Sequence, residues 1–158
     1  MPRSPAMDRT RTQIDSIDRA IIEQLQVDGR VPYTRLGAAV GLSEAAVRQR
    51  VQRLTDAGVL QVVGVTNPLS LGFRRMAMIG VRAAGPTDEL TAALQAMPDI
   101  DYLVVTAGSF DALCEVVVSD DHALIELTNR IRAVPGVMST ETFIYLDLVK
   151  QTFTWGAH

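Results

Sequence analysis

The apolar positions in the first part of the chain recur with the period of an α-helix. In the first predicted helix they lie three or four residues apart and form one face, consisting of Ile14, Ile17, Ile21 and Leu25. Asp15 is predicted to cap the start of this helix, and Gly29 lies just past its end. An amphipathic helix of this kind needs a partner against which to bury its apolar face.

Two shorter helices follow, and together they predict a helix-turn-helix. The second helix is expected over residues 33–40 and the third over residues 44–57. Gly41 and Leu42 would form the turn between them, and Ser43 is predicted to cap the third helix. This spacing is typical of a DNA-reading motif whose second helix, here the third of the chain, enters the major groove.

Beyond the three helices the pattern changes to alternating strands and helices. Residues 60–66 are predicted as a strand and residues 67–73 as a hinge rich in turn-forming residues. The remaining elements are a strand over 76–83, a helix over 88–97 capped by Thr87, strands over 100–107 and 112–118, a helix over 122–134 and a strand over 137–148. The order βαββαβ predicts a ferredoxin-like domain, so the whole chain is expected to be an α+β protein.

Two of the predicted strands are apolar on both faces. In the strand over 100–107, Leu103 points to one face and Val104 to the other, and the strand over 112–118 is apolar on both faces except at Glu115. Two helices can cover only one face of a four-stranded sheet, so the second face needs another cover. A second copy of the chain is the simplest cover, and a homodimer is the smallest assembly that we expect.

The third predicted helix has one apolar face, formed by Val47, Val51 and Leu54, and one polar face. The candidate DNA contacts are the residues of that polar face and of the helix start: Ser43, Glu44, Ala45, Arg48, Gln49, Gln52 and Arg53. Arginine and glutamine can each grip a base in two places, and alanine allows close approach. Arg50 lies beside the apolar stripe and is expected to pair with an acid such as Asp18. The alternative interpretation is a solvated face on an ordinary helical hairpin.

Length and charge fit a chain of two unlike parts. The 158 residues allow one medium domain or two small ones, and the net charge of −3 is divided into about +2 over residues 1–60 and −5 over the rest. Only the first part could comfortably approach a polyanion. No apolar run is long enough to span a membrane and no export signal is visible, so we expect a cytoplasmic protein. The expected parts are a flexible arm (1–12), a helix-turn-helix domain (13–59), a linker strand and hinge (60–74) and a second domain (75–158).

The sequence contains little that would support catalysis. Cys114 is the single cysteine, which excludes an intramolecular disulfide framework, and its apolar surroundings predict an inert core residue. His122 begins a predicted helix and His158 ends the chain, so neither is well placed for acid–base chemistry. We find no zinc-ligand cluster, nucleophilic triad or phosphate-binding glycine loop. We therefore expect no enzymatic activity, no metal and no cofactor.

The chain resembles the Lrp/AsnC family, the leucine-responsive and asparagine-responsive regulators. The resemblance covers about residues 13–156 in order, through IDRAIIEQLQVDGRVPYTRLGAAVGLSEAAVRQRVQRLTDAGVLQ, PLSLGF, TAGSFDALCEV, RIRAVPGVMSTETF and LVKQTFTW. It implies a winged helix-turn-helix followed by an amino-acid-metabolism regulation domain, assembled as dimers and often as octamers of four dimers. One departure is Pro32-Tyr33, where a capping serine or threonine is common.

The turn GSFD between two predicted strands is the candidate effector site. Its backbone N–H groups around Gly108 could hold a carboxylate while Asp111 pairs with an ammonium group, as needed for a zwitterion. In similar family members this loop lines the amino-acid pocket between dimers. The candidate effector-binding residues are Gly108, Ser109, Asp111 and, on a nearby strand face, Tyr102 and Thr106. The alternative is an ordinary hairpin turn in which the aspartate is structural.

The expected function is therefore that of a sequence-specific transcriptional regulator. Its partners would be a double-stranded DNA operator and an amino acid or related small metabolite, with no membrane partner. One alternative is a siroheme-type decarboxylase-like enzyme, which is similar to this family in fold but calls for ionisable groups in a large pocket of the second domain. The other is a metabolite-binding adaptor without DNA binding, which the arginines and glutamines of the third helix disfavour.

Overall fold

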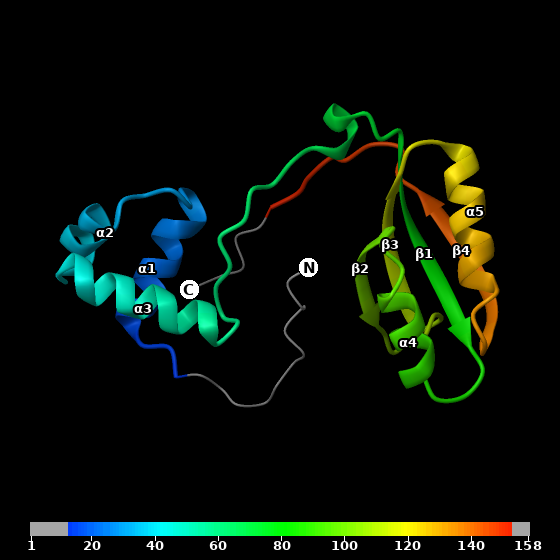
Figure 1. Cartoon of the computed structure of the whole chain (residues 1–158), viewed down its shortest axis with the longest axis horizontal. Coiled ribbons are helices and arrows are strands. Elements are labelled where there is room, and N and C mark those ends of the chain that lie inside the picture. The colour runs from blue at the N-terminus through cyan, green and yellow to red at the C-terminus, as the bar shows by residue number, and fades with distance from the viewer. Residues whose placement is uncertain (1–12, 153–158) are drawn as a thin grey trace. The chain divides into compact units, whose positions relative to one another are not determined.

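The computed structural model describes residues 13–152, and the chain divides into two compact units (Figure 1). Among the described residues, the first unit holds 13–64 together with 150–152, and the second holds 65–149. Each unit has its own core of buried apolar side chains. The arm predicted at residues 1–12 lies outside the described residues.

Three helices form the first unit: α1 (Ser16–Val27), α2 (Tyr33–Val40) and α3 (Glu44–Asp56). Their apolar faces meet in one core, whose buried side chains include Ile21, Leu25, Leu36, Val47, Val51 and Leu54. Helix formation here depends mostly on this shared burial, because helices of eight to thirteen residues are marginal in isolation. The predicted helix-turn-helix is confirmed.

The ends of these helices follow the sequence signals. The Asp15 carboxylate accepts a hydrogen bond from the backbone N–H of Asp18 at 2.7 Å, and the Asp18 carboxylate accepts one from the N–H of Asp15 at 3.1 Å. Ser43 caps α3 by accepting from a first-turn N–H at 3.2 Å. Gly41 ends α2 with φ of 72°, the left-handed region that glycine enters without strain. Pro32 begins α2 without a side-chain cap, in agreement with the departure noted in the sequence.

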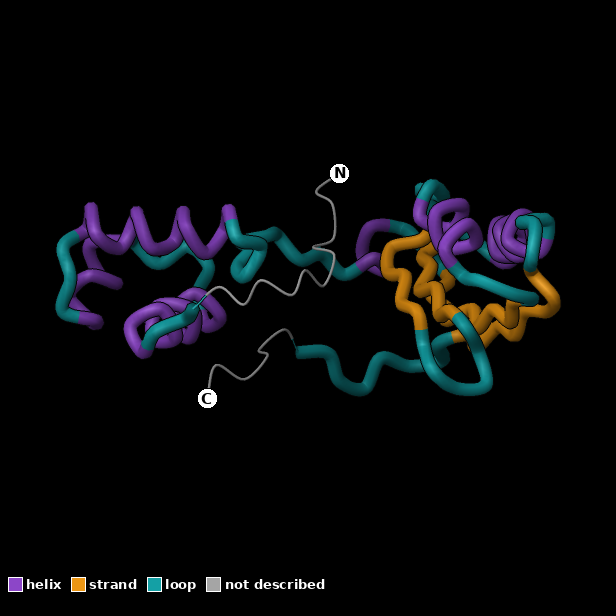
Figure 2. Tube along the Cα trace, turned by 90° about the horizontal axis from the view of Figure 1, so that it is seen from below, coloured by secondary structure: helices purple, strands orange, loops and turns teal. Residues whose placement is uncertain are grey.

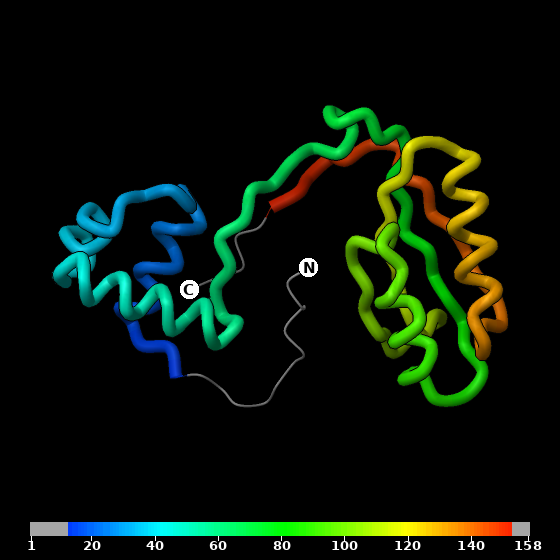
Figure 3. The backbone as a smooth tube through the Cα atoms, viewed as in Figure 1, coloured from blue at the N-terminus to red at the C-terminus, as the bar shows by residue number. Residues whose placement is uncertain are grey.

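The strand predicted at residues 60–66 is absent, so the wing implied by the resemblance is not formed in the single chain. The segment pairs with no other strand among the described residues, and Val62, Val63 and Val65 are each more than half exposed. Its valine-rich sequence suits a strand, but a strand forms only where a neighbour satisfies its backbone groups. A short 3₁₀ turn (Pro68–Leu71) follows within the predicted hinge, as the backbone path in Figure 3 shows.

The second unit contains β1 (Arg75–Ala83), α4 (Asp88–Gln95), β2 (Ile100–Val105), β3 (Ala112–Val118), α5 (Asp121–Arg132) and β4 (Val137–Ile144). The strands form one antiparallel sheet in the order β2-β3-β1-β4. Both helices lie on the same side of this sheet (Figure 2). The predicted ferredoxin-like βαββαβ arrangement is confirmed.

Two details of the second unit differ from the prediction. Thr87 precedes α4, but its side chain makes no capping hydrogen bond. Its backbone is already helical (φ −89°, ψ −7°), whereas a capping side chain needs an extended backbone to reach the first-turn N–H groups. Strand β4 ends at Ile144 rather than at residue 148; beyond its last pair with Ala77, the Tyr145 N–H still donates to the carbonyl oxygen of Met76 at 2.9 Å.

The two faces of the sheet have different surroundings. The centre of the face under α4 and α5 is buried, with Ile79, Cys114 and Val116 inaccessible to solvent. We call the opposite side the open sheet face, defined by Met78, Tyr102, Val104, Leu113, Val117 and Phe143. None of the described helices covers it, and Glu115, in its central strand β3, accepts a hydrogen bond from the Tyr145 hydroxyl at 2.9 Å. The predicted two-sided apolar character of residues 112–118 is therefore confirmed.

Candidate nucleic-acid interface and effector-binding turn

Helix α3 presents a shallow hollow on its exposed side. The residues lining it are Ala45, Arg48, Gln49, Gln52, Arg53, Asp56 and Ala57. The opposite side of α3 is buried through Val47, Val51 and Leu54. The structure thus brings the predicted DNA contacts of the helix body onto one exposed surface, and Ser43 and Glu44 lie exposed at the start of the same helix.

Arg48 is held in place although most of its side chain is exposed. Its Nη2 donates to Glu44 Oε1 at 2.6 Å, one helical turn back, and 64% of the side chain is open to solvent. Its guanidinium carbon lies 5.2 Å from the centre of the Tyr33 ring, which belongs to the start of α2. Spacing along the chain does not link Tyr33 with Arg48, because the contact joins two helices across the turn.

Two further residues predicted to contact DNA, Gln52 and Ser43, make hydrogen bonds to other residues of α3. Gln52 Nε2 donates to Asp56 Oδ1 at 2.8 Å, which directs the amide along the helix. The Ser43 hydroxyl oxygen accepts the capping hydrogen bond, so its proton remains available as a donor.

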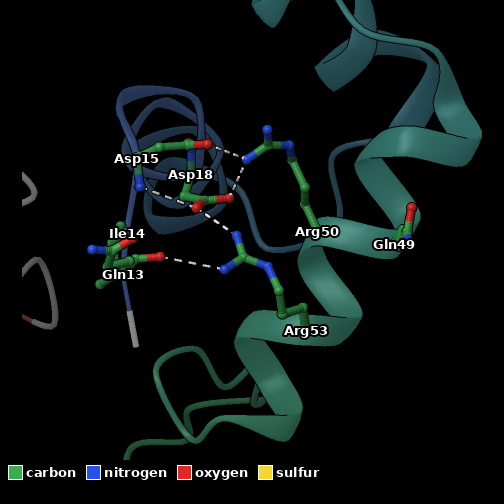
Figure 4. A pocket seen from close by; sticks show the side chains of 7 residues that line it. All are labelled: Gln13, Ile14, Asp15, Asp18, Gln49, Arg50 and Arg53. Atoms are coloured by element: carbon green, nitrogen blue, oxygen red, sulfur yellow. Dashed lines mark hydrogen bonds and ion pairs between the residues drawn. The ribbon is translucent and has the colours of Figure 1, made fainter. Parts of the chain in front are cut away.

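Arg50 faces α1, as predicted (Figure 4). Its Nη1 donates to Asp18 Oδ1 at 2.8 Å and to Asp15 Oδ2 at 2.7 Å. Only 26% of its side chain is exposed. Arg50 therefore ties α3 to the start of α1.

Arg53 lies on the exposed surface of α3, as predicted, but its guanidinium is also paired with α1. Its Nη2 donates to Asp18 Oδ2 at 2.5 Å and its Nη1 donates to the carbonyl oxygen of Gln13 at 3.3 Å (Figure 4). A helical wheel of α3 alone places Arg53 on the outer face but cannot show this pairing. The sequence signal for this pairing is Asp18 in the first turn of α1, whose carboxylate accepts hydrogen bonds from both Arg50 and Arg53.

Asp18 is fully buried at the centre of this ion-pair network. Burial alone would raise the pKa of its carboxyl, but the hydrogen bonds from Arg53 and Arg50 and from the Asp15 backbone outweigh burial and lower the pKa to about 2. The carboxylate is therefore charged at every physiological pH, and it keeps both guanidinium groups in place.

In the second unit, Asp111 fastens the GSFD turn to strand β1. Its Oδ2 accepts from the backbone N–H of Ala83 at 2.7 Å, and its own N–H donates to the carbonyl oxygen of Val81 at 2.9 Å. The Thr106 hydroxyl closes the same turn by donating to the carbonyl oxygen of Phe110 at 2.6 Å. The second carboxylate oxygen of Asp111, Oδ1, makes no hydrogen bond within residues 13–152.

The remaining predicted effector residues differ in their exposure and in their contacts. Gly108 and Ser109 are exposed at the tip of the turn, and a side chain at Gly108 would meet nothing within 4 Å. Tyr102 is 55% exposed on the open sheet face, opposite Glu115. Thr106 follows the end of β2 rather than lying within the strand, and its hydroxyl is already used in the turn.

The structure adds an aromatic residue to this region. The Phe110 ring lies directly over Gly80 of β1, where an added Cβ would come within 2.7 Å of the ring. Phe143 meets the Phe110 ring edge-on at 6.0 Å, and the Arg82 guanidinium lies 5.4 Å from its centre. A glycine inside an apolar strand often marks such a close approach, so Gly80 was the available signal.

Catalytic and metal chemistry find no support in residues 13–152. No group of three His, Cys, Asp or Glu side chains in this range could hold a metal ion. Cys114 is buried, and burial raises the pKa of its thiol to about 11, which confirms the prediction of an inert core residue. None of the described helices has the length and apolar character needed to cross a bilayer.

Comparison with known families places both units. Residues 14–55 match the AsnC-type helix-turn-helix domain, and residues 76–155 match the Lrp/AsnC ligand binding domain. The HTH-type transcriptional regulator FL11 of Pyrococcus furiosus is 32% identical over 141 residues, which cover 88% of this chain and 93% of that protein. The proline dehydrogenase transcriptional activator of Rhizobium radiobacter is 32% identical over 145 residues, with the same two coverages.

Solved structures agree with these matches. AsnC of E. coli superposes with a TM-score of 0.78 at 26% identity, and the feast or famine regulatory protein of M. tuberculosis, solved with L-methionine, superposes with 0.82 at 29%. Each comparison covers 90% of this chain and 99% of the other. The relatives are transcriptional regulators and not enzymes. Both units, in this order, show that the chain belongs to the Lrp/AsnC family of helix-turn-helix transcriptional regulators.

Proposed function

We propose that this regulator reads its operator through the exposed side of α3, over residues 43–53. The observation that carries the proposal is Arg48, which is largely exposed yet held by Glu44 and Tyr33 beside Gln49 and Gln52. Arginine reads guanine and glutamine reads adenine through paired hydrogen bonds in the major groove. Ser43, Glu44 and Ala45 lie at the helix start, which approaches base edges in this motif. Arg53 lines the same surface and completes the proposed set of contacts.

The test begins with a duplex that the full chain selects from a randomised DNA library. Arg48→Ala should weaken binding by about 1–3 kcal/mol and remove the preference at one base pair, as expected for a lost paired contact. Arg9→Ala, in the predicted arm, should weaken binding to all sequences alike, because an arm of this composition contacts phosphates. If both variants reduce affinity equally across a panel of single-base changes, this assignment of roles is wrong.

We also propose that the GSFD turn binds an amino acid or a related small metabolite. A similar protein, the feast or famine regulatory protein of M. tuberculosis, was solved with L-methionine. Two features support a zwitterion site here. Asp111 Oδ1 is without a hydrogen bond in the described residues, and the space around Gly108 is open. Direct titration of the full chain with L-methionine and then with each other proteinogenic amino acid tests this proposal, and no binding by any of them contradicts it.

The third proposal concerns assembly. The open sheet face supports a homodimer, because a sheet with one uncovered apolar face is stabilised by a second copy. Dimers would then associate further, up to an octamer, and the operator would be an imperfect inverted repeat whose half-sites are about one helical turn or a multiple of it apart. We expect this assembly to act in the cytoplasm. Sedimentation of the full chain, with and without the selected duplex, measures the number of copies.

A further inference from the structure

Tyr33, at the start of α2, contacts Arg48 of α3, the helix proposed to enter the major groove. Its ring is packed against the core of the first unit and only part of it is exposed. On its accessible side the ring lies 5.2 Å from the guanidinium carbon of Arg48. Because the core fixes the ring, the aromatic surface offered to Arg48 has one position.

The other contact of Arg48 is weaker as a positioning device. Glu44 is exposed on the same helix, and an exposed ion pair four residues apart restricts two flexible side chains only slightly. The Tyr33 ring, in contrast, belongs to a different helix and is packed against the core. Arginine has many rotamers, so a fixed surface beside the guanidinium narrows the set that the side chain occupies before DNA arrives.

Stacking on the ring does not use the atoms that would read a base. An aromatic ring attracts the flat face of a guanidinium group, whereas guanine accepts hydrogen bonds from its N–H edge. Arg48 can therefore remain on Tyr33 while its edge points into a groove. The contact with Glu44 occupies Nη2 in this structure, and the remaining edge donors stay available.

We propose that Tyr33 is a positioning residue for DNA readout: its ring holds the Arg48 guanidinium so that the start of α2 helps to set selectivity at the base pair that Arg48 reads. This inference rests on the proposed assignment of Arg48 to a base contact. It also gives a role to the Pro32-Tyr33 position, where the capping residue common in the family is replaced by a ring.

The experiment measures binding of the full chain to the selected duplex and to its single-base variants. Tyr33→Leu keeps an apolar side chain in the core but removes the ring. It should weaken binding to the selected duplex by about 2- to 5-fold and flatten the preference at the same base pair as Arg48→Ala, with other positions unchanged. Tyr33→Phe keeps the ring and should behave like the parent. Thr34→Ala, the adjacent exposed position of α2, is the matched control and should change neither quantity.

A double-mutant cycle separates this inference from the function on which it rests. Combined with Arg48→Ala, Tyr33→Leu should cause no further loss. If Arg48→Ala is selective for one base pair but Tyr33→Leu weakens all duplexes equally, or still weakens binding without Arg48, the positioning role is wrong and the function stands. Equal losses in Tyr33→Phe and Tyr33→Leu would assign the effect to the hydroxyl and also overturn the role. If Arg48→Ala changes no preference, both proposals fail.

Discussion

Two aspartates, Asp18 and Asp111, differ in their burial and in the groups that their carboxylate oxygens contact. Asp18 is fully buried, and its two oxygens receive Arg50, Arg53 and the N–H of Asp15. Asp111 is only partly buried, and one of its oxygens is bonded to the Ala83 N–H. Asp18 therefore stabilises the first unit, whereas Asp111 combines a structural bond with an oxygen that can accept a ligand.

The first prediction concerns Asp18→Asn, which should lower the free energy of unfolding by about 2 kcal/mol near neutral pH. The variant keeps the shape of the side chain but leaves two guanidinium groups beside a neutral amide, and the partial exposure of both arginines limits the cost. Urea unfolding followed by helical circular dichroism measures the difference. Glu23→Gln, an exposed position of α1 with the same charge change, is the control and should have little effect.

The difference between the parent and Asp18→Asn should also depend on pH. The pKa of Asp18 is about 2 in the folded chain and 3.8 in the reference state, so its stabilising effect is complete above pH 3.8 and is lost as the pH falls through about 2. Over this interval the two stability curves should converge. A difference that stays constant down to pH 2 would show that the charge of Asp18 is not the source of its contribution.

The second prediction separates the two uses of Asp111. Asp111→Asn retains an oxygen for the Ala83 N–H and should leave stability nearly unchanged, while Asp111→Ala should lower it by about 1 kcal/mol. Both variants should lose the response of DNA binding to the effector, since a neutral side chain holds an ammonium group much less strongly. Melting temperature and amino-acid-dependent DNA binding are the two measurements. An asparagine variant that responds like the parent would remove Asp111 from the effector site.

At the scale of elements, the periodicity of apolar residues predicted every described helix, because burial of one face leaves its trace in the sequence. It could not predict the ion pair between Arg53 and Asp18, since Asp18 lies on another helix. It also predicted a strand at residues 60–66, whose pattern is right but whose pairing partner is missing from the single chain. The same limit applies to Tyr33 and Phe110, whose contacts with Arg48 and with Gly80 depend on how elements pack.

The third prediction concerns the N-cap of α3. Ser43→Ala should lower stability by about 1 kcal/mol, because the first-turn N–H loses its acceptor. Ser43→Asp should retain the cap and the stability, since aspartate is an equally good capping residue. Its negative charge should nevertheless weaken DNA binding if Ser43 lies at the DNA interface, as proposed. Unfolding and duplex binding are measured on the same preparations, and an aspartate variant that binds like the parent would remove Ser43 from the interface.

At the scale of the molecule, the chain combines a helical unit and a sheet unit with unlike requirements. The first sixty residues carry about +2 and the remainder about −5, which suits a nucleic acid near the first part only. The open sheet face of the second unit is apolar around Leu113 and remains uncovered by the chain's own helices. Binding a palindromic operator and covering that face would both be satisfied by pairing two chains.

The fourth prediction tests this pairing in the full chain. Leu113→Glu introduces a charge at the centre of the open sheet face and should shift the protein from dimer or larger species to monomer, because an unpaired charge is costly at an apolar interface. Ile125→Glu, an equally large change at a 60% exposed position of α5, should leave the assembly unchanged. Sedimentation velocity compares the two. A Leu113→Glu variant with the mass of the parent assembly would exclude this face as the interface.

The network around Asp18 also affects how the protein responds to ionic strength. Helix α3 carries three arginines, but Arg50 and Arg53 are already neutralised by carboxylates of their own chain. A cation releases condensed counterions from DNA only when it meets a phosphate, at about 0.9 ion for each phosphate neutralised. Arg48 is proposed to contact a base rather than a phosphate, so affinity should fall less steeply with added salt than the charge of this helix indicates. Such a regulator would stay bound to its operator at salt concentrations that dissociate a regulator whose DNA-contacting helix carries more unpaired positive charge.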